Sequence, residues 1–275
     1  MKKVYIESVT SLMCTSDHPS ADLKKELEVL STQKFRRINR YILLGLCGVF
    51  NLPEINHVDK SSALYIGTKN GCISETVSML GQIYRDELLP MPFTFIGSST
   101  NMASYHIANA LGLHGGNYTL SHRYAPFECA LDMAYWDMVE GKSNSAIVGC
   151  IDEAALPLEA FKEVVGMGDV AELYEGGYWL SLTTHANNPI AEVVESKRFK
   201  TFAQVEAYLP REVKIIHDDS YPDNQSRGYI GSNSGLMFVE ALQEGVDEQI
   251  AYVTQLGQHQ FLMLMVKSLS VNDYN

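Results

Sequence analysis

Short apolar runs of the kind that form buried β-strands alternate with helical patterns along the whole chain. Ala63–Thr68 and Ser145–Ile151 are the clearest of these runs. Strands that alternate with helices favour an α/β fold with largely parallel sheets. Because the expected strands are equally numerous in the two halves of the chain, the pattern predicts a pseudo-duplicated core rather than a single Rossmann sheet.

The individual elements follow from hydrophobic periodicity and from turn residues. In the first half we expect strands at Val4–Val9, Ala63–Thr68, Phe93–Gly97, Tyr118–Ser121 and Ser145–Ile151, and helices at Lys34–Phe50, Thr76–Leu88, Ala103–Leu111 and Pro126–Met138. In the second half we expect strands at Tyr178–Thr183, Ala191–Val194, Val213–His217, Ile250–Thr254 and Phe261–Val266, and helices near Thr201–Leu209 and Gly235–Leu242. Pro126 suits a first helical turn, where its missing N–H leaves no hydrogen bond unmade.

Composition argues against several functional classes. Hydrophobic residues make up 46% of the 275 residues, which is enough for a substantial core. The net charge of −12 argues against nucleic-acid binding. The longest apolar stretch, Tyr41–Phe50, is too short to cross a bilayer, and no secretory signal is evident. The five cysteines contain no C-x-x-C pair, which argues against a zinc site and a disulfide framework and favours a cytoplasmic location.

Motifs spread over nearly the whole chain are similar to those of one enzyme family. They lie at Thr94–Gly116, Gly141–Asp152, Tyr174–Leu182, Gly231–Leu242 and Gly257–Phe261. In order and spacing they resemble the thiolase-fold ketosynthases, the β-ketoacyl-carrier-protein synthases. The resemblance implies an α/β, thiolase-like single domain over residues 1–275. Two similar βαβαβ-type halves, 1–170 and 171–275, would form an αβαβα layered core with a shortened second half.

The resemblance also locates the position of the family's nucleophilic cysteine. In the family this residue follows the second glycine of one turn by nine positions and precedes a later glycine by seventeen. Counted from Gly115 and Gly141, both spacings end at Tyr124. Acyl transfer needs a thiolate of low pKa at a helix N-terminus. A phenol, with a reference pKa of about 10, is a poor substitute.

Two catalytic histidines of the second half are also implied by the resemblance. His217 follows a strand as the first of them would, but its continuation does not match the family's His-Gly-Thr run. It is a weak candidate beside the interpretation as a strand-end histidine. Arg227–Ser232 offers no second histidine, and His259 is interpreted as structural. The Cys–His–His set is therefore not intact.

A ketosynthase-like chain without its nucleophile resembles the chain length factor of type II polyketide systems. Such a subunit pairs with a full-length ketosynthase, which carries the acyl-cysteine and performs decarboxylative condensation on malonyl–acyl carrier protein. This chain would shape the acyl tunnel and need no cofactor. In its short length, this chain is most similar to a small ketosynthase-like subunit of aryl polyene pigment clusters. The acidic carrier is expected to dock mainly on the catalytic partner, because like charges repel.

Large side chains near Tyr124 are candidates for the tunnel wall or the subunit interface. The tunnel candidates are Tyr118, Arg123, Phe127, Met133 and Met138, and the interface candidates are Met91, Pro92, Phe93 and Phe95. The alternative is that each is an ordinary core or rim residue.

Two other functions stay open. The chain could be a stand-alone β-ketoacyl synthase or acyltransferase with a displaced nucleophile, Cys129 or Ser121. Ser121 and its neighbour His122 would point to opposite faces of a strand, which disfavours a hydrogen-bonded pair. Cys129 can equally be a small core residue. The other possibility is a purely structural subunit without tunnel contact.

Overall fold

The described strands form one nine-stranded β-sheet that folds into two layers, named the first and the second sheet below, and β1 (Val4–Thr15) connects the two layers. This computed structural model describes residues 2–185, 188–217, 228–231, 233–245 and 249–269. In the first sheet, β1 pairs antiparallel with β5 (Tyr174–Thr183). Through its first residues it also pairs antiparallel with β6 (Ala191–Phe199) of the second sheet. The order across the described strands is β3-β2-β4-β5-β1-β6-β9-β8-β7. The remaining strands are β2 (Ala63–Thr68), β3 (Asn117–Ser121), β4 (Ser145–Asp152), β7 (Lys214–His217), β8 (Gln249–Gly257) and β9 (Gln260–Ser268).

The two sheets repeat one pattern of strand directions. From β1 the first sheet runs to β5, β4 and β2 through antiparallel, antiparallel and parallel pairs, and β3 then adds a parallel edge. From β6 the second sheet runs to β9, β8 and β7 through the same three kinds of pair. The described part of the second half has no strand equivalent to β3. The predicted duplicated core and shortened second half are thereby confirmed. β5 lies beyond residue 170, yet it pairs within the first sheet.

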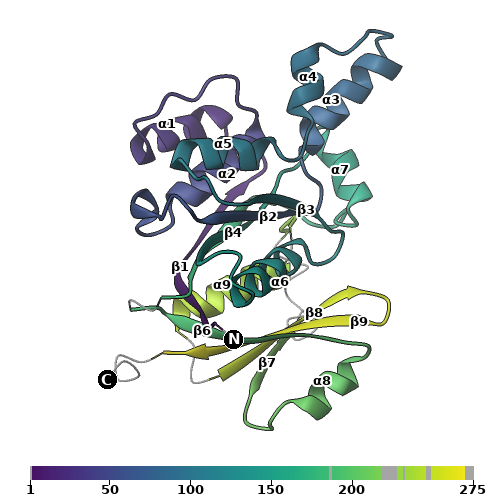
Figure 1. The fold of residues 1–275 in the computed structure, drawn as a ribbon. Coiled ribbons are helices and arrows are strands. Elements are labelled where there is room, and N and C mark those ends of the chain that lie inside the picture. The colour runs from purple at the N-terminus through teal and green to yellow at the C-terminus, as the bar shows by residue number, and fades with distance from the viewer. Residues whose placement is uncertain (1, 186–187, 218–227, 232, 246–248, 270–275) are drawn as a thin grey trace.

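Helices form three layers around these sheets (Figure 1). α6 (Pro126–Val139) and α9 (Asn233–Glu244) lie between the two sheets, among the largest group of buried apolar side chains. The first sheet's outer face is covered by α1 (Ser20–Leu30), α2 (Arg40–Phe50) and α5 (Met102–Leu111), and the second sheet's by α8 (Phe202–Tyr208). The arrangement has the predicted αβαβα layers. The other helices are η1 (Ile55–His57), α3 (Ile73–Tyr84), α4 (Pro92–Gly97) and α7 (Leu158–Val164).

One predicted strand is wrong. Phe93–Gly97 belongs to helix α4, which begins at Pro92. The backbone N–H groups of Thr94 and Phe95 both donate to Met91 O, which closes the first turn. Pro92 favours that start because its fixed φ suits a helix. An apolar run this short does not distinguish a strand from a helix by periodicity.

The start of α2 is later than predicted, and its cap explains why. Asn39 has an extended backbone, and its Oδ1 accepts a hydrogen bond from the backbone N–H of Ile42 at 3.0 Å. An asparagine in this position satisfies one of the N–H groups that have no partner within the helix. The helix therefore begins at Arg40 rather than at Lys34.

Gly149 of β4 makes room for the large indole of Trp179 in the neighbouring strand. A Cβ at this position would lie 2.1 Å from Trp179 Cε3, and the tryptophan is fully buried. We expect Gly149→Ala to lower the free energy of unfolding by about 1–3 kcal/mol through overpacking. Urea denaturation measures this, with Gly168→Ala as the control because a Cβ there meets no atom within 4 Å. Equal stability of the two variants would contradict the packing argument.

Candidate functional site

The position predicted for a nucleophile lies in the turn between β3 and α6. Strand β3 ends at Ser121, and α6 begins at Pro126. Gly67 of β2 lets this turn approach closely, since a Cβ there would lie 2.3 Å from the carbonyl oxygen of Pro126. Tyr124 is 55% exposed, and the Arg123 guanidinium lies over its ring at 5.8 Å. Two of the predicted site residues are thus adjacent at the surface.

The backbone N–H groups at this turn are bonded to a neighbouring side chain. Nδ1 of His122 accepts hydrogen bonds from the N–H of Tyr124 at 3.3 Å and from that of Ala125 at 3.0 Å. The imidazole and the Tyr124 ring meet edge to face at 6.4 Å between centroids. His122 therefore closes the turn that precedes α6. The sequence analysis considered this histidine only as a partner for Ser121.

The alternative nucleophiles lack the surroundings that their chemistry needs. Burial, followed by the nearby Glu128 carboxylate, raises the pKa of Cys129 to about 11. Its side chain packs beside Ala125, Leu256 and Leu262, so its thiol stays protonated near neutral pH. Ser121 is exposed at the end of β3, and Nδ1 of the adjacent His122 is already engaged. Neither arrangement provides an activated nucleophile.

His217 lies on the opposite face of the second sheet from α6. It is the last residue of β7, and its ring contacts those of Phe202 at 4.7 Å and Phe261 at 6.3 Å between centroids. Phe202 belongs to α8, which covers the outer face. The preceding residue, Ile216, faces the inner layer that contains α6. The structure does not bring His217 and Tyr124 together on one face.

The other histidine region is described only in part. His259 lies in the turn between β8 and β9 with a φ of 59°. Arg227 and Ser232 lie outside the described residues. Tyr229, which lies between these two residues in the sequence, is buried. Its ring contacts that of Tyr178 at 6.2 Å between centroids. The described residues of this stretch therefore pack an aromatic side chain against the core.

A buried carboxylate lies in the first turn of α6, and the sequence analysis missed it. Glu128 is fully buried, and it accepts hydrogen bonds from the hydroxyl of Ser234 at 2.5 Å and from that of Tyr252. Ser234 lies in α9 and Tyr252 in β8. A buried carboxylate needs such partners, because desolvation of an unpaired charge is costly. These hydrogen bonds connect the inner helices α6 and α9 to strand β8 of the second sheet.

The predicted tunnel residues separate into core and surface positions. Phe127 and Met138 are fully buried, and the Phe127 ring contacts Tyr178 at 4.7 Å. Met133 is partly buried against the same core. Tyr118 of β3 is 38% exposed and stacks on Tyr65 at 4.9 Å between centroids. The exposed turn and β3 are therefore the parts of this region that another protein chain can contact.

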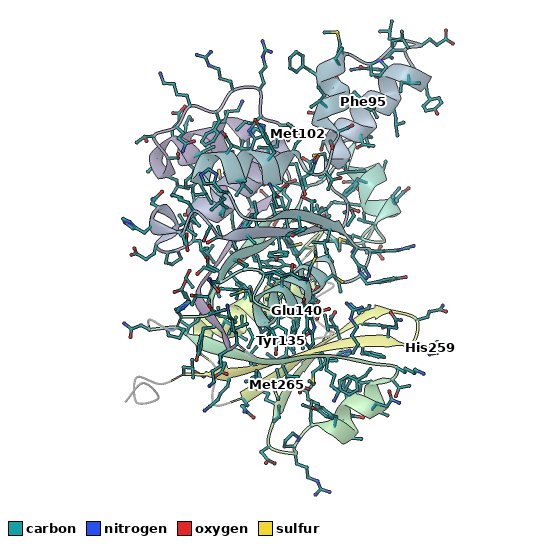
Figure 2. All side chains as sticks on the ribbon, viewed as in Figure 1. Phe95, Met102, Tyr135, Glu140, His259 and Met265 are labelled. Carbon is teal, nitrogen blue, oxygen red and sulfur yellow. The ribbon has the colours of Figure 1, made fainter. Side chains whose placement is uncertain are left out.

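Helices α3 and α4 form an arm, residues 73–97, that projects from the layered body (Figure 1). Phe95 lies on it in Figure 2. No residue of either helix is buried. Its large exposed apolar side chains are Val77, Leu80, Ile83, Tyr84, Leu88, Leu89, Met91, Phe93, Phe95 and Ile96. An exposed apolar surface of this kind marks an interaction site.

The base of the arm is fixed to the carboxyl end of β4. The N–H of Ser74 donates to Glu153 Oε1 at 3.0 Å, and its hydroxyl donates to Ala154 O at 2.8 Å. The N–H groups of Lys69 and Asn70 both donate to Asp152 Oδ1 at 2.9 Å. These contacts hold the start of the arm against the first sheet.

Burial at this base raises the pKa of two carboxyl groups. It raises that of Asp152 to about 6 and that of Glu153 to about 8, and the neighbouring Glu175 carboxylate adds to the second shift. Unfolded, both groups titrate near 4. Between the unfolded and the folded pKa of each group, the folded chain holds a proton that the unfolded chain has released. Stability therefore falls as the pH rises through this interval.

We therefore expect the free energy of unfolding to fall between pH 5 and about 8.5. Urea denaturation at several pH values measures it. Glu153→Gln should flatten this dependence, because it keeps the acceptor for Ser74 and removes the ionising group. Glu163→Gln is the matched control, since Glu163 is exposed on α7. A wild-type stability that rises over this interval would contradict the burial argument.

Within the described ranges, no three or more His, Cys, Asp or Glu side chains are grouped so that they could hold a metal ion. In the same residues, every helix is too short or too polar to cross a membrane.

Comparisons with known proteins identify the fold. No family profile matches the sequence, and no curated protein matches it. The ishigamide ketosynthase/chain length factor superposes with a TM-score of 0.70 at 13% identity, over 98% of this chain and 100% of that one. The chain has the ketosynthase fold. The predicted thiolase-like fold is thereby confirmed.

Two further structures with the ketosynthase fold match along their whole length. A chain of the complex between a type II polyketide synthase acyl-carrier protein and its ketosynthase, bound to the hexaketide, has a TM-score of 0.68 at 11% identity, over 98% of this chain and 100% of that one. A chain of the complex between a ketosynthase and its chain length factor from Xenorhabdus doucetiae has a TM-score of 0.58 at 12% identity, over 97% and 100% of the two chains. At these identities the comparison establishes the fold and leaves the activity to be argued from the site.

Proposed function

We propose that this chain is a non-catalytic, chain length factor-like subunit of a polyketide or fatty-acid-like ketosynthase. The observation that carries the proposal is the turn before α6. Tyr124 occupies the nucleophile position, and His122 bonds the adjacent amides. The chain keeps the fold while lacking an acyl acceptor at this position. Ketosynthase–chain length factor complexes among the structures of the same fold support this assignment.

The partner is a full-length ketosynthase, and two surfaces support a heterodimer. Strand β3 is an edge that pairs only with β2 among the described strands, and its Tyr118 is exposed. An exposed edge strand readily pairs with another chain. The α3–α4 arm supplies an apolar surface, with Phe93 and Phe95 as proposed interface residues. Arg123 and Tyr124 lie beside β3 and would line the same interface.

In this proposal the partner holds the acyl-cysteine and performs decarboxylative condensation on malonyl–acyl carrier protein. This chain contributes one wall of the product tunnel, from Tyr118, Tyr124 and the core residues Phe127 and Met133 behind them. It works in the cytoplasm. The acidic carrier docks mainly on the partner, because this chain has a net charge of −12. We assign it to aryl polyene biosynthesis on the sequence resemblance alone.

Co-expression with the cognate ketosynthase tests the proposal. We expect a heterodimer on gel filtration that extends malonyl–acyl carrier protein, whereas this chain alone makes no product. A stand-alone synthase or acyltransferase would instead be active without a partner. An active homodimer of this chain would contradict the proposal.

A further inference from the structure

Acyl transfer from a thioester needs hydrogen-bond donors as well as a nucleophile. A thiolate attacks the carbonyl carbon, and negative charge collects on the carbonyl oxygen before the donor thiolate leaves. Backbone N–H groups aimed at that oxygen stabilise the charge, and loss of one such donor slows catalysis by about 10²–10³-fold. A turn at a helix start, like the one before α6, presents such groups.

In this chain two amides of the turn, those of residues 124 and 125, are occupied. The N–H groups of Tyr124 and Ala125 donate to one atom, Nδ1 of His122. An N–H group only donates, so Nδ1 accepts both hydrogen bonds and the ring proton lies on Nε2. The imidazole is partly buried and lies against the Tyr124 ring. Pro126 has no N–H to replace the occupied groups.

We propose that His122 is a positioning residue that closes this turn to acyl transfer by occupying the amides of residues 124 and 125. The loss of chemistry then has two independent causes, the phenol at position 124 and the imidazole at position 122. The inference rests on the proposed function only in taking Tyr124 as the nucleophile position. It predicts that a thiol introduced at position 124 is reactive but poorly acylated.

The test separates acylation from alkylation. In Tyr124→Cys, the thiolate of the introduced cysteine attacks the thioester carbon of octanoyl-coenzyme A. A new carbon–sulfur bond forms, the bond to the coenzyme A sulfur breaks, and the released coenzyme A takes up the proton that the cysteine lost to solvent. We expect this reaction to be slow and to accelerate about 10²-fold or more in Tyr124→Cys/His122→Ala, because the amides are freed. Alkylation by iodoacetamide involves no oxyanion, so the two variants should be alkylated at the same rate. Mass spectrometry follows both reactions.

Tyr124→Cys/His122→Asn is the matched control, because an asparagine oxygen can still accept the two amides. It should be acylated as slowly as Tyr124→Cys. The inference is overturned if His122→Ala leaves the acylation rate unchanged, or if it raises alkylation and acylation by the same factor. Because Tyr124 is 55% exposed, the thiol of the variant is accessible to reagents, and we expect the substitution to leave the fold intact.

A second measurement uses the unmodified chain. Nitrogen-15 NMR of the imidazole should show the Nε2–H tautomer, and His122→Ala should accelerate hydrogen exchange of the Tyr124 and Ala125 amides. A protonated Nδ1 at neutral pH would overturn the inference. None of these measurements involves a partner, so failure to bind a ketosynthase would refute the proposed function and leave the role of His122 standing.

Discussion

Replacing Phe93 and Phe95 together by aspartate should abolish binding to the ketosynthase partner. The two side chains are 64% and 65% exposed on the α3–α4 arm, where the Arg37 guanidinium lies over the Phe93 ring at 4.9 Å. Aromatic residues at the centre of an interface often dominate its binding free energy. Two buried, unpaired carboxylates would add a desolvation penalty. We expect the dissociation constant to rise by at least about 100-fold.

The same substitution should hardly change the free energy of unfolding, since neither α3 nor α4 has a buried residue. Isothermal titration calorimetry measures the affinity, and urea denaturation measures the stability. Val29→Asp is the matched control, because Val29 is 87% exposed on α1, away from the arm. Wild-type affinity in the arm variant, or an equal loss in Val29→Asp, would refute the role of the arm.

Replacing Arg40 by methionine should have the largest effect on stability. The Arg40 guanidinium pairs with the Glu175 carboxylate, which is fully buried, and also donates to Ser20 Oγ at 2.9 Å. Removing one partner of a buried pair typically costs about 3–5 kcal/mol, because the other charge is left unpaired. Glu175 also accepts from the N–H of Ala154, whose carbonyl accepts from Ser74 at the base of the arm. The variant should therefore loosen the arm as well.

A double-mutant cycle isolates this interaction. Glu175→Gln keeps a side chain that can accept from Ala154 and removes the charge. Added to Arg40→Met, it should recover part of the lost stability in thermal and urea denaturation. If Arg40→Met costs less than about 1 kcal/mol, the pair behaves as a surface ion pair and the argument is wrong. Lys25→Met, which breaks an exposed pair with Asp22, is the control.

The layered fold could be predicted because its inner strands are short apolar runs bounded by turn residues. Ala63–Thr68 coincides with β2, and the run beginning at Ser145 differs from β4 by one residue. Helix α1 was not predicted, because Leu23 and Leu27 are its only buried residues and the rest of its surface is largely polar. Helix α7 was also not predicted: Leu158, Phe161 and Val165 recur at helical spacing, but the helix spans only seven residues. Such helices are fixed by packing rather than by local sequence pattern.

Of the candidate site, only the position of Tyr124 could be proposed from spacing along the chain. Tyr124 follows from two distances in the sequence, and the structure places it in the turn before α6. The environment of Glu128 depends on Ser234 and Tyr252, which lie 106 and 124 positions away in sequence. The role of His122 depends on how the turn folds back over its ring. The contacts of Glu128 arise from tertiary structure and leave no local pattern, whereas those of His122 span two and three positions and depend on the conformation of the turn.

Intact-mass spectrometry of the purified chain with acyl– and malonyl–acyl carrier protein tests the central claim most directly. The account predicts that the mass stays unchanged and that no condensation product forms until the ketosynthase partner is added, whose own mass then increases. A stable acyl adduct on Cys129, Ser121 or Tyr124 of the isolated chain, together with an extended product, would contradict it.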